Sequence, residues 1–195
     1  MVQLALFTAI ILLMTFTPIG YIRTLGVEIT LIVVPVTVGA IVLGPVNGAI
    51  LGGVFGITSF LQCFGMSPFG TTLFGINPLG TFILCLVPRI LMGWLTGVIF
   101  LGIKKIDKTK NISYAVASLT GPLLNTLFFM PLLVLFFYQT DYIQGFAEAL
   151  GTNNVFSFII GFVGINGLIE AAVCFVLGTA ISKTIDVYSK RSSIK

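Results

Sequence analysis

Residues 79–103 read LGTFILCLVPRILMGWLTGVIFLGI, and Arg89 is the only charged residue among them. At about 1.5 Å per residue, a helix over this stretch is longer than the roughly 30 Å hydrocarbon core of a bilayer. Such a long, almost uncharged run is typical of a membrane-spanning segment. The stretch therefore predicts a helix that crosses a membrane with some tilt.

The rest of the chain is also strongly apolar and carries few charges. Of its 195 residues, 57% are hydrophobic and only 8% are charged, whereas a soluble domain carries roughly 25% charged residues. So few charges cannot cover a soluble surface, and the length suits one domain. We therefore expect an all-α integral membrane protein, with a single membrane domain over residues 1–195. Its six predicted helices cover residues 2–16, 29–44, 46–63, 79–103, 112–138 and 155–181.

Basic residues are concentrated in two polar segments, the loop 104–111 and the tail 182–195. Eight of the ten basic residues of the chain lie there: Lys104, Lys105, Lys108, Lys110, Lys183, Lys190, Arg191 and Lys195. An even number of spans puts both segments and both termini on one face, and the positive-inside rule makes that face cytoplasmic. The longer connections 17–28, 64–78 and 139–154 then lie outside, where they are suited to enclose a ligand.

The composition excludes several kinds of chemistry. The chain has no histidine, so it has no histidine base and no histidine-bound metal. Its cysteines, Cys63, Cys85 and Cys174, show no metal-binding spacing and are expected to be free, buried and apolar in behaviour. No Walker A motif is present. We therefore expect no catalytic residue, no metal and no cofactor in this chain, and no nucleic-acid partner; ATP hydrolysis would need another chain.

Two charged residues, Arg89 and Glu170, and two asparagines, Asn125 and Asn166, fall inside the long apolar spans. A charge in the centre of a membrane costs roughly 2.5–3.5 kcal/mol on insertion scales, so it faces a cavity or a partner. In one interpretation, Arg89 and the asparagines line an outward-facing pocket for a carboxylate or phosphate. In the other, Arg89 and Glu170 form an ion pair across the bundle.

Two further features bear on this site. Asn77 is one of few polar side chains in the connection 64–78, which makes it an additional candidate ligand contact. Pro88 has no N–H to donate to the Leu84 carbonyl, so an acceptor is left free at the depth of Arg89.

Small residues recur every fourth position in two places. Gly44, Gly48, Gly52 and Gly56 form one stripe, and Ala5 and Ala9 form a shorter one. Such stripes let helices approach closely in lipid. Packing within the bundle is the favoured interpretation of the glycines, whereas docking of another membrane subunit is a serious alternative for the alanines.

Residues 26–59, GVEITLIVVPVTVGAIVLGPVNGAILGGVFGITS, resemble an early segment of the substrate-binding S components of energy-coupling factor (ECF) vitamin transporters. In that family an A-x-x-x-A motif on the first helix, here Ala5 and Ala9, contacts the coupling subunit. The resemblance implies a multi-pass protein of a bacterial cell membrane, surrounded by lipid, that binds one vitamin beneath its outer loops. It also implies a transmembrane coupling protein and two ABC-type ATPases, which hold ATP and Mg, as partners against which the S component topples.

Within the family, the early segment is most similar to pantothenate-type members. Pantothenate is a small anion with hydroxyl and amide groups, which suits one arginine and several asparagines. Pyridoxine, riboflavin, folate and cobalamin stay open as alternatives. A membrane scaffold or assembly protein without a transport function is the alternative from a different class.

Overall fold

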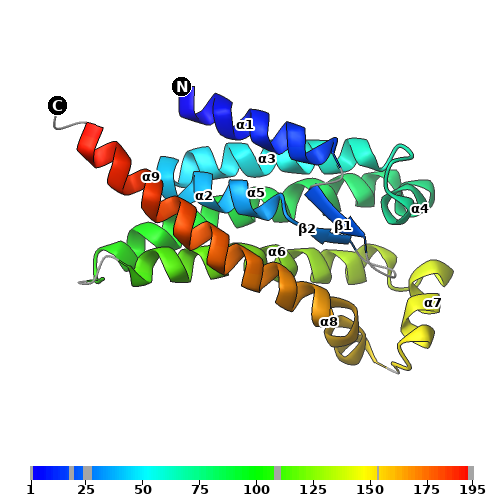
Figure 1. Cartoon of the computed structure of the whole chain (residues 1–195). Helices are drawn as coiled ribbons and strands as arrows, with labels where there is room; N and C mark the ends of the chain where they lie inside the picture. The colour runs from blue at the N-terminus through cyan, green and yellow to red at the C-terminus, as the bar shows by residue number, and fades with distance from the viewer. Residues whose placement is uncertain (1, 18–19, 24–27, 108–110, 153, 193–195) are drawn as a thin grey trace.

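The computed structural model describes residues 2–17, 20–23, 28–107, 111–152 and 154–192, with the backbone alone at 21–23, 28–29, 165–166 and 186–192. The described part is helical apart from one short hairpin, and its long helices lie side by side in an elongated bundle (Figure 1). The elements are α1 (Val2–Thr15), β1 (Tyr21–Arg23), β2 (Glu28–Thr30), α2 (Val33–Leu43), α3 (Pro45–Gln62), α4 (Pro68–Ile76), α5 (Pro78–Lys104), α6 (Ile112–Phe137), α7 (Asp141–Ala149), α8 (Val155–Val173), the π-helical turn η2 (Cys174–Gly178) and α9 (Thr179–Ser192).

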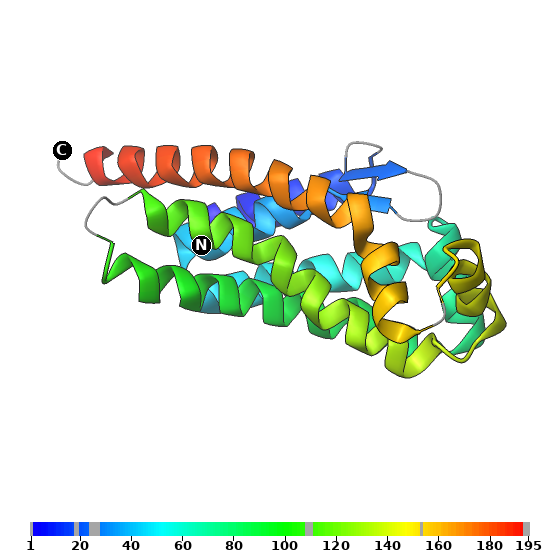
Figure 2. The same cartoon turned by 90° about the horizontal axis from the view of Figure 1, so that it is seen from below.

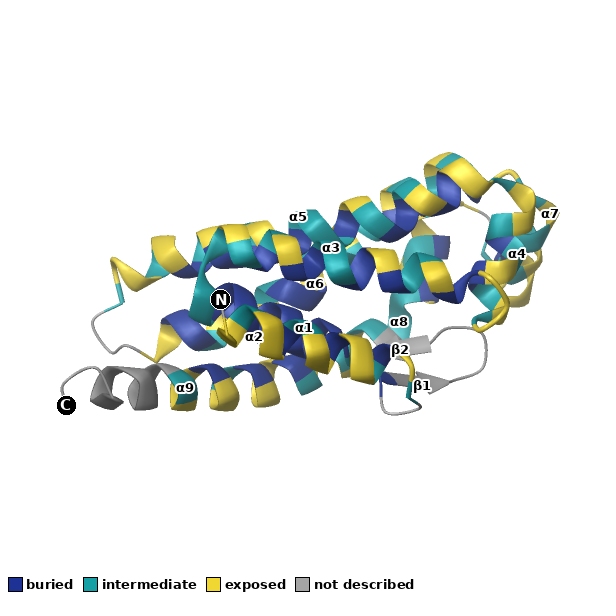
Figure 3. Cartoon of the chain, turned by 90° about the horizontal axis from the view of Figure 1, so that it is seen from above, coloured by how far each residue is buried: buried dark blue, intermediate teal, exposed yellow. Residues whose placement is uncertain are grey.

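Among the described residues, three helical segments are long and apolar enough to cross a membrane: Pro78–Lys104, Ile112–Phe137 and Gly167–Ile185. Shorter apolar helices cover Val2–Thr15, Val33–Leu43 and Val155–Gly164. The outward faces of the bundle are exposed (Figure 3) and carry large apolar side chains, such as Leu127, Leu135 and Leu168. A soluble monomer rarely exposes so much apolar surface, so these faces are suited to lipid. The chain is a helical membrane protein.

Proline and polar caps set where several helices begin. Pro45, Pro68 and Pro78 each occupy the first turn of a helix, where the missing N–H costs nothing. The Ser67 side chain accepts from the N–H of Gly70 at the start of α4, and the Asn77 side chain does the same for Gly80 at the start of α5. These caps satisfy helix donors that would otherwise have no partner.

Two predicted helix boundaries are wrong. The helix expected over 29–44 begins only at Val33, because residues 28–30 form β2 and pair in antiparallel register with β1. The helix expected over 155–181 is broken at Gly164, whose φ of 26° and ψ of −128° are not helical. Glycine tolerates this conformation because it has no Cβ. Figure 2 shows the first part of α8 turned away from the line of α9.

The three predicted outer connections and the predicted tail contain more secondary structure than expected. The connection 64–78 contains α4, the connection 139–154 contains α7, and the connection 17–28 contributes β1. The tail predicted from residue 182 is helical in α9 as far as Ser192. Residues 108–110 of the basic loop lie outside the described part of the chain.

The glycine stripe packs inside the bundle, as the sequence favoured. A Cβ on Gly48 or Gly52 would collide with the backbone carbonyl of Gly93 or Arg89 on α5. Gly56 faces the Cys85 carbonyl in the same way, whereas Gly44 has a φ of 90° and faces open space. The stripe therefore brings the backbone of α3 directly against α5, over the segment that carries Arg89.

The elements at the two ends of the bundle differ. The start of α1, the end of α5, the start of α6 and the end of α9 lie at one end, while α4, α7 and the hairpin lie at the other (Figure 1). Both ends of the described chain are therefore on the same side of the bundle.

Candidate ligand-binding site

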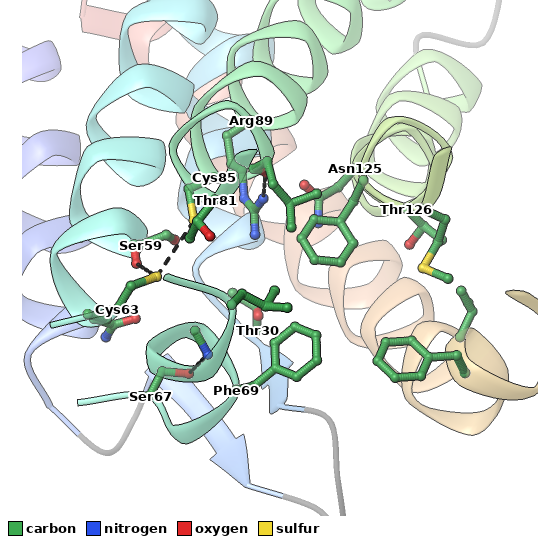
Figure 4. A pocket seen from close by; sticks show the side chains of 18 of the residues that line it. Thr30, Ser59, Cys63, Ser67, Phe69, Thr81, Cys85, Arg89, Asn125 and Thr126 are labelled. Atoms are coloured by element: carbon green, nitrogen blue, oxygen red, sulfur yellow. Dashed lines mark hydrogen bonds between the residues drawn. The ribbon is translucent and has the colours of Figure 1, made fainter. Parts of the chain in front are cut away.

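A cavity of about 170 Å³ lies between α3, α5, α6, α8 and β2, beneath α4. Because α4 and β2 help to enclose it, the cavity is near the end of the bundle that carries α4, α7 and the hairpin. Its wall combines aromatic and aliphatic side chains with a few convergent polar groups, which is typical of small-molecule sites. Figure 4 shows polar side chains from α3, α5 and α6 directed into one space, with Phe69 of α4 on another side.

Arg89 is held in this cavity by its own helix. Pro88 interrupts the hydrogen-bond ladder of α5, and the Arg89 guanidinium takes over the free acceptor, with Nη1 donating to the Leu84 carbonyl at 2.6 Å. The guanidinium also lies over two aromatic rings, 5.5 Å from the centroid of Phe55 and 4.9 Å from that of Phe129. Cation–π contacts of this kind hold a desolvated arginine in place. Its Nε is buried and has no hydrogen-bond partner among the described residues.

Asn125 and Glu170 complete the polar part of the wall. Within the part of the chain that the structure describes, Oδ1 of Asn125 on α6 and Oε1 of Glu170 on α8 are both buried without a hydrogen-bond partner. The Glu170 carboxylate is hydrogen-bonded by the backbone of Thr30 on β2, and the charge of Arg89 acts on it. Three polar atoms from three helices are therefore unsatisfied around one cavity, at a cost of about 1–3 kcal/mol each unless something binds there.

Aromatic side chains cover the cavity from the α4 side. Phe69 of α4 and Phe162 of α8 line it, with ring centroids 6.0 Å apart. Phe69 also contacts Tyr142 and Phe146 of α7, at 6.0 and 6.2 Å between ring centroids. Since α7 is amphipathic, with Ile143 and Ala147 buried, this cluster joins α4, α7 and α8 into one cover.

Two cysteines form part of the wall between α3 and α5. Cys63 and Cys85 both line the cavity, with their Sγ atoms 3.9 Å apart. All three cysteines are free and buried, as expected from the sequence. A pair of thiols adds a polarisable, mostly apolar surface to the site.

The predicted site residues fall into four groups. Arg89, Asn125 and Glu170 meet at the cavity. Asn77 does not line it, because its side chain caps α5 with Oδ1 2.9 Å from the Gly80 nitrogen. The side chain of Asn166 lies outside the described residues. Ala5 and Ala9 are exposed on α1, on the outside of the bundle.

Several residues that line the cavity or contact Arg89 were not predicted from the sequence. Phe55 and Phe129 hold Arg89, but nothing distinguishes them locally among the 18 phenylalanines of the chain. Thr30 lies in a stretch predicted to be helical. Ser59, Gln62 and Thr81 carry a local signal, since polar residues inside predicted apolar spans are expected to face protein or a cavity.

A bundle of apolar helices that encloses convergent, unsatisfied polar groups near one end defines a membrane protein with a small-molecule site. Comparison with known proteins shows which family of membrane proteins this is. The model of the family described as "ECF transporter, substrate-specific component" matches residues 1–182. The chain belongs to this family, and it is the substrate-binding S component of an ECF transporter.

The chain is also similar in sequence to a pantothenate transporter. It is 29% identical over 201 residues to the pantothenate transporter PanT of Leuconostoc mesenteroides, and the match covers 97% of this chain and 93% of that protein. The match extends well beyond residues 26–59, on which the resemblance to the family was first based.

Proposed function

We propose that this S component binds pantothenate in the Arg89 cavity and delivers it as part of an importer. The observation that carries the proposal is the set of three unsatisfied polar atoms, Arg89 Nε, Asn125 Oδ1 and Glu170 Oε1, around one cavity. Arg89 binds the carboxylate of the ligand, and Asn125 pairs with its amide or a hydroxyl. Asn166 is a further proposed contact. The similarity to PanT supports pantothenate as the vitamin.

The cavity also argues against the larger alternatives. At about 170 Å³ it is smaller than the roughly 300–1,000 Å³ of pockets for drug-sized ligands, which disfavours folate and cobalamin. A flavin needs free aromatic faces for stacking, but the Arg89 guanidinium already lies over Phe55 and Phe129. Pyridoxine has no negative charge for Arg89. Family membership makes a scaffold without transport function the weakest alternative.

The proposal includes partners and an orientation. A transmembrane coupling protein docks on α1 at Ala5 and Ala9, and two ABC-type ATPases supply the energy with their own ATP and Mg. The S component topples against the coupling protein to deliver its ligand. The chain crosses a bacterial cell membrane six times, with both termini in the cytoplasm and the α4, α7 end outside. The exposed lysines Lys104, Lys105 and Lys183 support this orientation through the positive-inside rule.

Calorimetric titration of the purified protein in detergent tests the ligand assignment. Pantothenate should bind tightly, while pyridoxine, riboflavin, folate and cobalamin should not compete. Arg89→Met should weaken pantothenate binding about ten- to a hundredfold, because a charge-assisted hydrogen bond is worth roughly 1.5–3 kcal/mol. Arg89→Lys should recover only part of this loss, since an ammonium cannot form a two-pronged contact. Tight binding of another vitamin instead of pantothenate would overturn the assignment.

A further inference from the structure

Glu170 is a buried carboxylate whose hydrogen bonding is incomplete. It lies on α8, in the segment Gly167–Ile185 that is long enough to cross a membrane, and it lines the cavity. The backbone of Thr30 hydrogen-bonds the carboxylate, but Oε1 is buried and no described residue pairs with it. An ionised carboxylate only accepts hydrogen bonds, so Oε1 needs a donor.

Arg89 does not supply that donor in this arrangement. Its Nη1 donates to the Leu84 carbonyl, and its Nε is itself unpaired. An unpaired donor and an unpaired acceptor thus face the same cavity without a hydrogen bond between these two atoms. Simple neutralisation of Glu170 by Arg89 leaves both atoms unexplained, whereas a bound molecule with an acceptor at one point and a donor at another satisfies both.

We propose that Glu170 is a specificity-determining contact that accepts a hydrogen bond from a hydroxyl of the ligand, while Arg89 binds its carboxylate. This inference rests on the proposed function, and it narrows the ligand class to organic anions that also carry a hydroxyl donor. A ligand without that hydroxyl leaves a buried carboxylate oxygen unpaired. Sites built around such a contact reject the analogue that lacks the hydroxyl by large factors.

The alternative is that Glu170 acts only through Arg89, by attracting the guanidinium and fixing its position. The two roles differ in what they do to ligand discrimination. A positioning residue affects every carboxylate ligand equally, whereas a hydroxyl acceptor affects only ligands that have the hydroxyl.

The test compares two ligands on three forms of the full chain in detergent. The ligands are pantothenate and the analogue in which both hydroxyls are replaced by hydrogen. The proteins are the unaltered chain, Glu170→Met, which removes the acceptor, and Glu170→Gln, which keeps an acceptor oxygen without the charge. Glu148→Met is the matched control, because Glu148 is exposed on the outside of α7. Affinities are measured by calorimetry and folding by thermal melting.

The unaltered chain should prefer pantothenate over the analogue by at least about a hundredfold. Glu170→Met should lose about ten- to a hundredfold in affinity for pantothenate, while its affinity for the analogue stays constant or rises. Discrimination then falls to within a few-fold, with Glu170→Gln intermediate and Glu148→Met unchanged. If Glu170→Met fails to melt cooperatively, Glu170→Gln carries the test, and its discrimination should fall by the smaller, intermediate amount.

An equal loss for both ligands, with discrimination unchanged, would overturn the hydroxyl contact and make Glu170 a positioning residue for Arg89. The proposed function would survive that result. Failure of pantothenate to bind the unaltered chain would instead contradict the proposed function and this inference with it. The two failures are distinguishable because the second one is observed before any substitution is made.

Discussion

At the scale of single residues, the site depends on a proline. Pro88 cannot donate to the Leu84 carbonyl, and in a membrane an unpaired carbonyl is costly. Arg89, the next residue, satisfies that carbonyl with its own side chain. The same hydrogen bond turns the guanidinium back along α5 and into the cavity. A local defect in the helix thus fixes the orientation of its only interior charge.

Pro88→Ala tests this account. The new N–H of residue 88 can donate to the Leu84 carbonyl. It then competes with the Arg89 side chain for this acceptor, so the guanidinium becomes more mobile. We expect thermal stability in detergent to rise and pantothenate affinity to fall about three- to tenfold, the effect of one hydrogen bond of roughly 0.5–1.5 kcal/mol. Pro131→Ala in α6 is the control, since Pro131 is exposed and does not line the cavity. Unchanged affinity in Pro88→Ala would show that the proline does not position Arg89.

The polar residues of the site were predictable from the sequence for one reason. Arg89, Asn125 and Glu170 are costly in lipid, so their presence in apolar spans already indicates a shared interior. Their aromatic partners were not predictable, because Phe55 and Phe129 differ from other phenylalanines only in tertiary contacts. Asn77 shows the opposite case. An asparagine directly before a proline is a helix-start signal, and the structure gives Asn77 that capping role.

At the scale of helices, the close contact between α3 and α5 determines where Arg89 lies. Gly52 on α3 faces the backbone carbonyl of Arg89, so a Cβ at this position has no room. The neighbouring Gly53 has space for a Cβ, which would lie 3.8 and 4.0 Å from side-chain atoms of Ile90, at ordinary contact distance. The two adjacent glycines therefore form a matched pair, one inside the helix contact and one beside it.

Gly52→Ala should force α3 and α5 apart at Arg89 and lower both thermal stability and pantothenate affinity. Gly53→Ala should be neutral or stabilising, because alanine is favoured over glycine in a helix by roughly 1 kcal/mol. Melting curves and titrations on both variants check this. Equal effects of the two substitutions would mean that the stripe does not set the approach of α5.

A second feature at the scale of helices is the exposed pair of alanines on α1. If Ala5 and Ala9 form the docking surface for the coupling protein, replacing both with tryptophan should abolish complex formation and uptake. Pantothenate affinity of the isolated chain should stay within a few-fold, because these residues are exposed on the outside of the bundle. Ala172→Trp, at another exposed alanine, is the control. An equal loss of ligand binding would show that the alanines support the fold instead.

Helix prediction succeeded where apolar runs are long and failed where tertiary contacts decide. Residues predicted helical over 79–103 and 112–138 correspond closely to α5 and α6. The start of α2 was misplaced because residues 28–30 pair with residues 21–23, a contact that no local apolar pattern reveals. The break at Gly164 was missed because glycine is common throughout these helices and only its backbone angles distinguish it.

At the scale of the whole molecule, charge is distributed between the two ends of the bundle. Lys104, Lys105 and Lys183 are exposed near the end where α9 terminates, and Asp141 and Glu148 are exposed on α7 at the other end. This asymmetry predicts that the α7 end, which carries the cavity and its aromatic cover, faces outside the cell.

Labelling with a membrane-impermeant thiol reagent in intact cells tests the orientation. Glu148→Cys should react from outside, while Lys105→Cys and Lys183→Cys should react only after the cells are permeabilised. The unaltered chain is the control, because its three cysteines are buried. Labelling of the Lys105 position from outside would invert the orientation and place the cavity on the cytoplasmic side.

The central claim, that the cavity around Arg89 holds the vitamin, is tested most directly by native mass spectrometry of the protein purified in detergent from cells grown with pantothenate. The unaltered chain should carry one bound molecule with the mass of pantothenate, and Arg89→Met, at matched thermal stability, should carry none. A chain that retains no small molecule, or an Arg89→Met variant that retains pantothenate as fully as the unaltered chain, would contradict the account.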